Sequence, residues 1–138
     1  MTQEMTALKT AIIERFGTPC AVIDLDLVAR NIVTAQERCD AVGLENRPHI
    51  KTHKSPVLAN LQIKAGAQGI TCQKLGEAEV MANAGITDII IATNLLGAAR
   101  SGRLAKLQRR LPLKVCADNT VSLSAYSQAA AQAGRPMD

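Results

Sequence analysis

From position 47 to its end, the chain alternates short β-branched runs with longer segments in which apolar residues recur every three or four positions. The short runs predict strands, and the longer segments predict helices. Parallel strands joined by right-handed crossover helices are the usual outcome of such alternation. The pattern therefore predicts an α/β fold, either a doubly wound sheet or part of a (β/α)₈ barrel.

Four strand–helix units can be placed in this part of the chain. The isoleucine run at 88–92 is typical of a strand buried on both faces. Before the repeat, the run CAVID at 20–24 predicts a further strand, and an apolar periodicity from about Leu27 to Gly43 predicts a helix. The four units comprise predicted strands at 47–51, 68–72, 88–92 and 113–117 and predicted helices at 56–65, 77–84, 98–110 and 119–133.

A (β/α)₈ barrel needs eight strands and about 250 residues, and the 138 residues here provide for about half of one. We therefore expect residues 1–138 to be the N-terminal part of a longer protein. They would supply the first four βα units of a barrel, preceded by an N-terminal helix and strand. A complete protein of this length is the alternative.

Composition narrows the function classes. Aromatic residues make up 1% of the chain, so little is available to stack on bases and single-strand nucleic-acid binding is disfavoured. No apolar run approaches the ~18 residues of a membrane span. The four cysteines form no CxxC pair and three of them lie in apolar runs, which favours buried free thiols in a reducing cytoplasm. The basic segment at 99–114 offers a surface for an acidic partner, but its leucine spacing favours a solvated outer helix.

The segment RPHIKTHKS, at 47–55, carries the strongest candidate for chemistry. Side chains alternate along a strand, so if Ile50 packs against helices, Lys51 lies on the opposite face, at the carboxyl end where barrels keep their active sites. A desolvated lysine amine can condense with a carbonyl as a Schiff base. The alternative is a strand-end lysine in an internal ion pair. Lys54 is expected to reach solvent or a phosphate.

The chain has two histidines, His49 and His53, on either side of Lys51. On a strand their spacing would separate them by about 13 Å, at ~3.3 Å per residue. A shared metal ion is therefore disfavoured, and no metal ligand is predicted in this chain. His53 is expected to hydrogen-bond either a cofactor group or a neighbouring strand.

Three stretches occur in a specific order: TPCAVIDLDLVARNI at 18–32, RPHIKTHKS at 47–55 and GITCQKLGEAEVMANAGITDIIIATNLLG at 69–97. Together they resemble the D-threonine aldolase and D-serine dehydratase group. These are pyridoxal 5′-phosphate (PLP) enzymes with the alanine-racemase type of barrel, called fold type III. The resemblance covers about 18–118. It rests on a TPxxxxDLDxxxxN opening, an HxKTHK motif and a CQKxxEAE turn.

The resemblance implies that Lys51 carries PLP as a Schiff base and that Gln73 contacts the cofactor, with His53 as a further cofactor-binding candidate. It implies a D-configured β-hydroxy-α-amino acid as substrate, cleaved between Cα and Cβ to glycine and an aldehyde. One alternative is β-elimination of the D-serine dehydratase type, in which the Cα proton and then water leave. Another is a non-catalytic PLP-binding barrel protein.

In this family, the second half of the barrel supplies most phosphate contacts. A C-terminal β-domain supplies a histidine and an aspartate for a divalent metal ion. This chain matches neither part. We therefore expect a full-length protein that needs a metal ion and forms a cytoplasmic homodimer, and we expect the 138-residue chain alone to be inactive.

Overall fold

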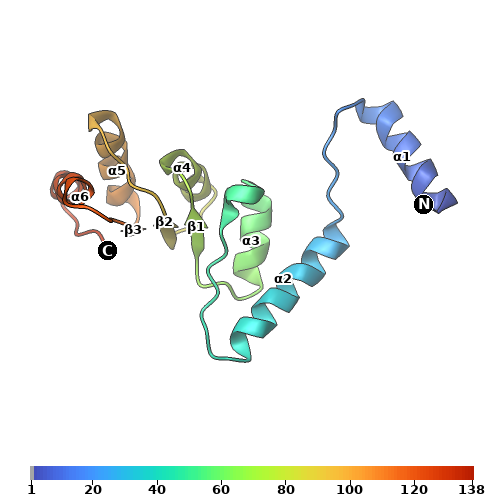
Figure 1. Cartoon of the computed structure of the whole chain (residues 1–138), viewed down its shortest axis with the longest axis horizontal. Helices are drawn as coiled ribbons and strands as arrows, with labels where there is room; N and C mark the ends of the chain where they lie inside the picture. The colour runs from blue at the N-terminus through green and yellow to red at the C-terminus, as the bar shows by residue number, and fades with distance from the viewer. Residues whose placement is uncertain (1) are drawn as a thin grey trace. The chain divides into compact units, whose positions relative to one another are not determined.

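The computed structural model describes residues 2–138, which fall into two compact units, one ending at Arg30 and one spanning Asn31–Asp138. The first unit holds helix α1, Gln3–Phe16, an extended stretch, and the start of helix α2, Leu25–Asp40 (Figure 1). None of the residues of α1 is buried. Its N-terminus is capped by Thr2, whose hydroxyl oxygen accepts a hydrogen bond from the N–H of Met5 at 3.3 Å.

The strand predicted at 20–24 is not formed. These residues are exposed, and no β-ladder in residues 2–138 includes them. Residue type gives a run its strand propensity, but a strand forms only where a partner satisfies its backbone groups. Helix α2 begins at Leu25, two residues earlier than predicted, because the Asp24 carboxylate accepts a hydrogen bond from the N–H of Leu27 at 2.9 Å.

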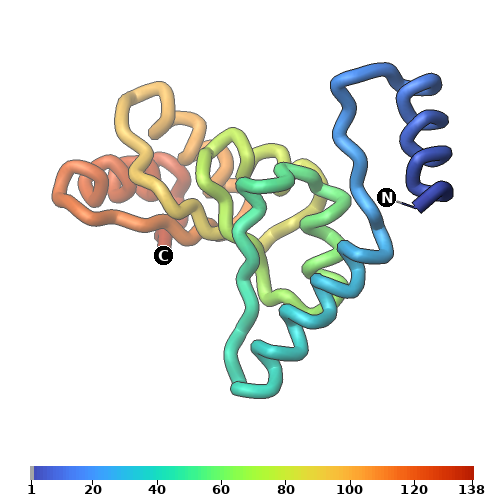
Figure 2. Tube along the Cα trace, turned by 45° about the vertical axis from the view of Figure 1, so that its right-hand side comes forward, coloured from blue at the N-terminus to red at the C-terminus, as the bar shows by residue number. Residues whose placement is uncertain are grey.

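The second unit is built on a parallel sheet in the order β1-β2-β3, which confirms the α/β prediction. Figure 2 follows the strand–helix alternation along the Cα trace from α3 to the C-terminus. The strands are shorter than predicted: β1 is Ile70–Cys72, β2 is Ile89–Ile91 and β3 is Leu113–Val115. The helices are α3, Pro56–Lys64, α4, Leu75–Asn83, α5, Ala98–Arg110, and α6, Thr120–Ala133.

The strand predicted at 47–51 is reduced to one bridge, between His49 and Thr71. The N–H of Thr71 donates to the Pro48 carbonyl at 2.8 Å, so this segment runs beside β1. The chain then turns into a 3₁₀ helix, η1, Ile50–Thr52. A longer ladder cannot form, because Pro48 has no N–H to donate and η1 withdraws the residues that follow His49.

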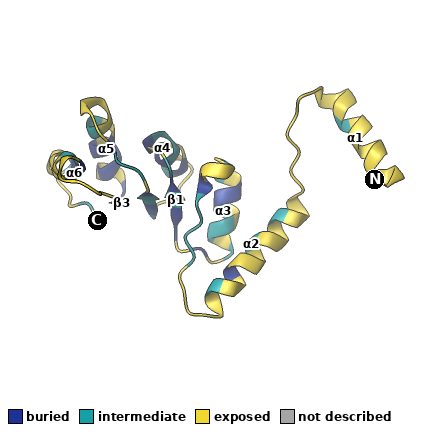
Figure 3. Ribbon diagram, in the orientation of Figure 1, coloured by how far each residue is buried: buried dark blue, intermediate teal, exposed yellow. Residues whose placement is uncertain are grey.

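The sheet buries one face against the helices. Figure 3 shows burial concentrated on the strands and on the helix sides turned toward them. The opposite face, with Thr71, Ile90 and Lys114, is only partly buried. The isoleucine run of β2 was predicted to be buried on both faces. The structure covers it on one face only, so this prediction is wrong. The core comprises Ile70, Cys72, Ile89, Ile91 and Leu113 from the strands, Ile50 from η1, and Ala59, Ala78, Met81, Leu104, Leu107, Tyr126 and Ala129 from the helices.

Helix α5 is an outer helix, as its leucine spacing predicted. Leu104 and Leu107 are buried, as is Leu111 at its C-terminal cap. All four of its arginines are bound within the chain. Arg100 donates to the carbonyl of Leu96 at 3.4 Å and Arg103 donates to Glu79 at 2.9 Å. Arg109 donates to the carbonyl of Gln132 at 2.8 Å, and Arg110 donates to Asn83 at 2.8 Å. No helix in residues 2–138 is long and apolar enough to cross a membrane.

The cysteines differ in burial, and this predicts a difference in how fast their thiols are alkylated. Cys72 is fully buried, and burial, with a smaller effect from the Glu77 charge, raises the pKa of its thiol to about 12. Cys20 and Cys116 are exposed, so the prediction of buried thiols is wrong for these two. Because the thiolate is the reactive form, we expect iodoacetamide at neutral pH to alkylate these two and to reach Cys72 only after unfolding. Mass spectrometry of native and denatured samples measures this. Rapid alkylation of Cys72 in the folded chain would contradict the packing.

Candidate active site at the carboxyl ends of the strands

The register of the sheet brings two predicted site residues to the same edge. Thr71 pairs with His49 on one side and with Ile90 on the other. Two positions later along their segments come Lys51 and Gln73, both past the carboxyl ends of the paired stretch. The carboxyl edge of a parallel sheet is where α/β proteins bind ligands.

Lys51 lies on η1 and not on a strand, so the strand parity that was expected to turn its amine inward does not apply. Its neighbour Ile50 is fully buried in the core, and Lys51, on the first turn of η1, is exposed. No ion pair among residues 2–138 engages its amine. The internal ion pair that was the alternative interpretation of Lys51 is therefore not formed.

The two histidines are each bound to backbone, which the sequence pattern did not reveal. The Nδ1 atom of His49 accepts the N–H of Lys51 at 3.2 Å, and that of His53 accepts the N–H of Ser55 at 3.0 Å. In a neutral imidazole the other nitrogen then carries the proton. The Nε2 atom of His53 is buried and has no hydrogen-bond partner in the described part of the chain. An unpaired buried donor costs ~1–3 kcal/mol, so this atom is suited to a ligand acceptor.

Glu77, which the sequence analysis did not single out, connects the lysine-bearing turn to the end of β1. Its Oε2 atom accepts the N–H groups of Gln73 at 2.8 Å and Lys74 at 3.3 Å. Its Oε1 atom lies 3.6 Å from the Nζ atom of Lys54. The spacing from Lys74 to Glu77 matches a capping box, which was the available signal.

A cavity of about 500 Å³ opens beside Glu77 at this edge of the sheet. Thr93 and Asn94, which follow β2, line it. Lys54 lines this cavity, and its side chain is 59% exposed, as predicted for a lysine that reaches solvent. The other polar lining residues are Gln73, Lys74, Glu77, Arg100 and Arg103.

Tyr126 ties the loops that follow β2 and β3. Its hydroxyl accepts the N–H of Leu95 at 2.9 Å and lies 3.2 Å from the carbonyl oxygens of Thr93 and Cys116, to either of which it can donate. Burial raises the pKa of this phenol. Asn94 also donates to Asp118, at 2.6 Å. The loops at the carboxyl edge are therefore fixed to each other.

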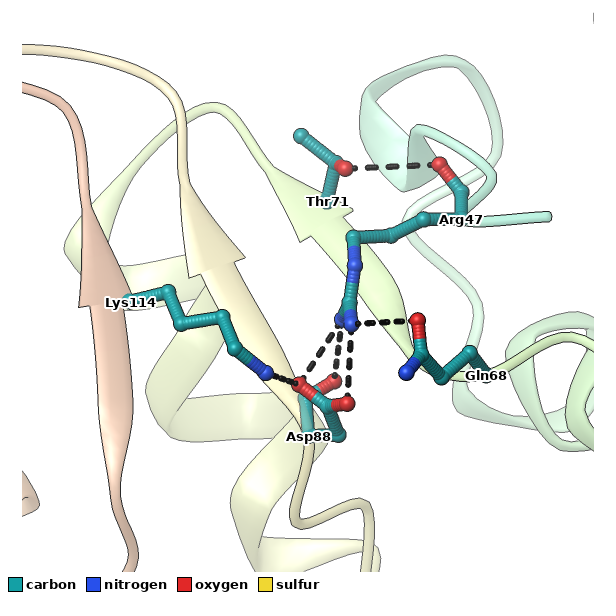
Figure 4. Close-up of polar contacts among 5 residues, drawn as sticks. All are labelled: Arg47, Gln68, Thr71, Asp88 and Lys114. Atoms are coloured by element: carbon teal, nitrogen blue, oxygen red, sulfur yellow. Dashed lines mark hydrogen bonds and ion pairs between the residues drawn. The ribbon is translucent and has the colours of Figure 1, made fainter. Parts of the chain in front are cut away.

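A charged network lies at the opposite, amino edge, on the face away from the helices (Figure 4). Arg47 binds both carboxylate oxygens of Asp88 at 2.8 Å, and Lys114 reaches the same carboxylate at 2.7 Å. Arg47 passes over Gly69, where an added Cβ would lie 2.5 Å from the Asp88 carbonyl oxygen. This arrangement joins three segments and has no free group for chemistry.

The network makes Asp88 a source of pH-dependent stability. The hydrogen bond from Arg47, followed by that from Lys114, holds the pKa of Asp88 below its usual 3.8. A lowered folded-state pKa stabilises the fold above the ordinary value, and this contribution is lost as pH falls through the folded value. We expect Asp88→Asn to cost about 1–2 kcal/mol at pH 7 and progressively less below pH 3.8. Urea unfolding across pH measures this, and a pH-independent cost would contradict it.

Among residues 2–138, no group of three or more His, Cys, Asp or Glu side chains is arranged to hold a metal ion. The described residues therefore do not fit the metal site that the family resemblance implied for the full-length protein. Lys51, Gln73 and His53 instead lie on neighbouring segments at one edge, with an amine, an amide and a buried ring nitrogen.

Comparison with known proteins identifies the family. The family described as alanine racemase, N-terminal domain, matches residues 23–138. The chain belongs to this family. The resemblance drawn from the three sequence motifs is thereby confirmed at the level of the alanine racemase N-terminal domain.

The chain is similar to curated enzymes that are named as aldolases and dehydratases. A D-threonine aldolase from Arthrobacter sp is 41% identical over 124 residues, which are 90% of this chain and 33% of that protein. D-threo-3-hydroxyaspartate dehydratase from Delftia sp. (strain HT23) is 44% identical over 110 residues, 80% of this chain and 29% of that protein. This chain thus spans about a third of the length of these relatives.

A solved structure extends the comparison to three dimensions. The crystal structure of D-threonine aldolase from Filomicrobium marinum superposes with a TM-score of 0.84 at 38% identity, covering 88% of this chain and 33% of that one. The α/β arrangement of the alanine racemase N-terminal domain is therefore shared with the corresponding third of that enzyme.

Proposed function

We propose that this chain is the N-terminal portion of a PLP-dependent aldolase that cleaves D-β-hydroxy-α-amino acids to glycine and an aldehyde. The observation that carries this proposal is the placement of Lys51. Its amine is free of ion pairs among residues 2–138, at the carboxyl edge of a parallel sheet. The similarity of 90% of this chain to a D-threonine aldolase adds support.

The proposal includes a partial (β/α)₈ barrel over residues 1–138. The sheet is covered on one face, and both of its edges carry further pairing. On the side of β1 the segment ending at His49 pairs with Thr71. On the side of β3, the N–H of Asp138 donates to Leu113 at 3.3 Å and the N–H of Val115 donates to Asp138 at 2.7 Å. A one-sided sheet that extends at both edges is consistent with an arc of a barrel.

The residues at the carboxyl edge fit PLP. Lys51 offers the amine that condenses with the aldehyde, His53 offers a buried N–H that lacks an acceptor, and Gln73 offers an amide. When bound, PLP supplies an electron sink for the charge that develops at Cα as a substrate bond breaks. In this assignment Lys51 binds the cofactor and later moves a proton, while His53 and Gln73 orient it.

A second reaction is kept as the alternative, because the dehydratase relative is 44% identical, slightly above the aldolase relative at 41%. In a β-elimination the Cα proton leaves first and then water, giving a keto acid and ammonia. A non-catalytic PLP-binding barrel is the third possibility. The divalent metal ion and the homodimer expected of the full-length protein are part of the proposal and involve residues beyond this chain.

A chimera tests the proposal. In it, this chain replaces the matched third of the Filomicrobium marinum D-threonine aldolase, which is 38% identical to it. With PLP and a divalent metal ion, we expect the chimera to convert D-threonine to glycine and acetaldehyde. Ammonia and a keto acid would instead favour the elimination. A folded chimera that binds PLP and turns over no D-β-hydroxy amino acid would contradict both enzymatic assignments. The unaltered aldolase is the control.

A further inference from the structure

The motif HxKTHK presents two primary amines three residues apart, Lys51 and Lys54, and both side chains are largely exposed. Either amine can in principle attack an aldehyde. We propose that Glu77 is a positioning residue that holds Lys54 away from the reacting aldehyde and so leaves Lys51 as the amine that captures it. This inference rests on the proposed function, and it adds a residue that selects between the two lysines.

The two amines differ in their partners. The Nζ atom of Lys54 lies 3.6 Å from Oε1 of Glu77, whereas Lys51 has no carboxylate partner among residues 2–138. A carboxylate attracts the ammonium form of an amine, and that form carries no lone pair for attack on a carbonyl. Contact with Glu77 therefore holds the Lys54 amine in place, and no carboxylate among residues 2–138 holds that of Lys51.

The carboxylate of Glu77 is itself held in place. Its side chain is only 10% exposed, and its other oxygen accepts the N–H groups of Gln73 and Lys74 at the start of α4. An anchor held by two backbone donors cannot follow Lys54 as that long side chain moves. The ion pair therefore holds the Lys54 amine near the start of α4, where the Glu77 carboxylate is fixed by its backbone hydrogen bonds.

The backbone of the turn that carries Lys54 is also fixed. The N–H of Lys54 donates to the carbonyl of Ile50 at 2.8 Å, which closes the turn. Lys54 has φ +50°, in the left-handed region. Among residues 2–138 it is the only non-glycine residue with positive φ. Its side chain lines the cavity beside Glu77, and Lys51 does not line that cavity. Of the two lysines, Lys54 thus lies at this cavity, which Gln73 also lines, and Lys51 does not.

The chemistry gives a direct readout. A neutral lysine nitrogen adds to the aldehyde carbon of PLP, the oxygen leaves as water, and a C=N bond forms. Borohydride then delivers hydride to that carbon while the nitrogen takes a proton from water, leaving a stable secondary amine. Fragmentation mass spectrometry of the peptide around 47–55 distinguishes a label on Lys51 from one on Lys54, so the ratio of the two labels reports which amine was selected.

The experiment compares the 138-residue chain with its Glu77→Gln and Glu79→Gln variants at limiting PLP. Glu79 is the matched control, because it lies on the same helix and pairs with Arg103 instead. In the unaltered chain and in Glu79→Gln, we expect label on Lys51 to exceed label on Lys54. In Glu77→Gln, the Lys54 to Lys51 ratio is expected to rise about two- to fivefold, the range for loss of an exposed ion pair. An unchanged ratio in Glu77→Gln would overturn the inference.

A salt series on the unaltered chain covers the case in which Glu77→Gln does not fold, as judged by circular dichroism. Salt screens exposed ion pairs, and the Lys54 side chain is 59% exposed, so the same ratio is expected to rise with sodium chloride. A Lys54 to Lys51 label ratio that does not change with salt concentration would contradict the role of Glu77. If Lys51 is not labelled in the unaltered chain at low salt, the proposed function fails first. If Lys51 is labelled and neither arm moves the ratio, only the selection by Glu77 fails.

Discussion

Replacing Lys51 by alanine is expected to lower turnover of D-threonine by the chimera by about 10⁴-fold or more, the scale seen when a residue of covalent catalysis is removed. The reason is chemical: in the proposed function the Lys51 amine condenses with the PLP aldehyde, and alanine offers no amine. Lys51→Arg is expected to be equally inactive, since a guanidinium keeps the charge but does not condense with an aldehyde.

The measurement is kcat at saturating substrate and PLP, with each variant checked for folding by circular dichroism. Lys64→Ala is the matched control, because Lys64 is an exposed lysine at the end of α3, and it is expected to retain parental activity. A Lys51→Ala chimera within about tenfold of the parent would remove Lys51 from the reaction.

Replacing Ile89 by alanine in the 138-residue chain is expected to cost about 2–5 kcal/mol of unfolding free energy, as for other large-to-small core changes. Ile89 lies on the central strand between Ile70 and Leu113, and it is fully buried. A loss of that size is a large share of the ~5–15 kcal/mol that stabilises a typical domain.

Ile90 provides the control for this prediction. It is the next residue on the same strand and only partly buried, on the face away from the helices. Ile90→Ala is expected to cost about 1 kcal/mol or less, because it leaves a smaller cavity. Urea unfolding followed by circular dichroism compares the two variants. Equal costs at both positions would contradict a core that lies on one side of the sheet.

Local pattern was sufficient to predict much of the second unit. The alternation of short β-branched runs and helical periodicity depends on neighbouring residues, so β1, β2, β3 and the helices between them were predicted to within a few residues at their ends. The packing of Ile50 against the helices was also predicted from the local alternation, and the burial of Ile50 confirms it. The cofactor roles of Lys51, Gln73 and His53 stay predictions.

Partners distant in sequence set the features that were missed. The run at 20–24 has strand propensity, but a strand also needs a neighbouring strand, and its own residues do not encode one. Asp88 lies 41 positions from Arg47, and Glu77 lies far along the chain from Lys54. A single sequence gives no signal for such pairs. The start of η1 at His49 depends on a ring nitrogen accepting a backbone N–H two residues on, which strand parity does not anticipate.

The decisive measurement is the number and position of borohydride-reduced PLP groups on the unaltered chain at one equivalent of PLP. If Lys51 is the cofactor lysine, mass spectrometry after digestion should find the label concentrated at Lys51, with little on other lysines. Label spread evenly over the exposed lysines, or concentrated at a position other than 51, would show that this edge of the sheet does not bind PLP as proposed.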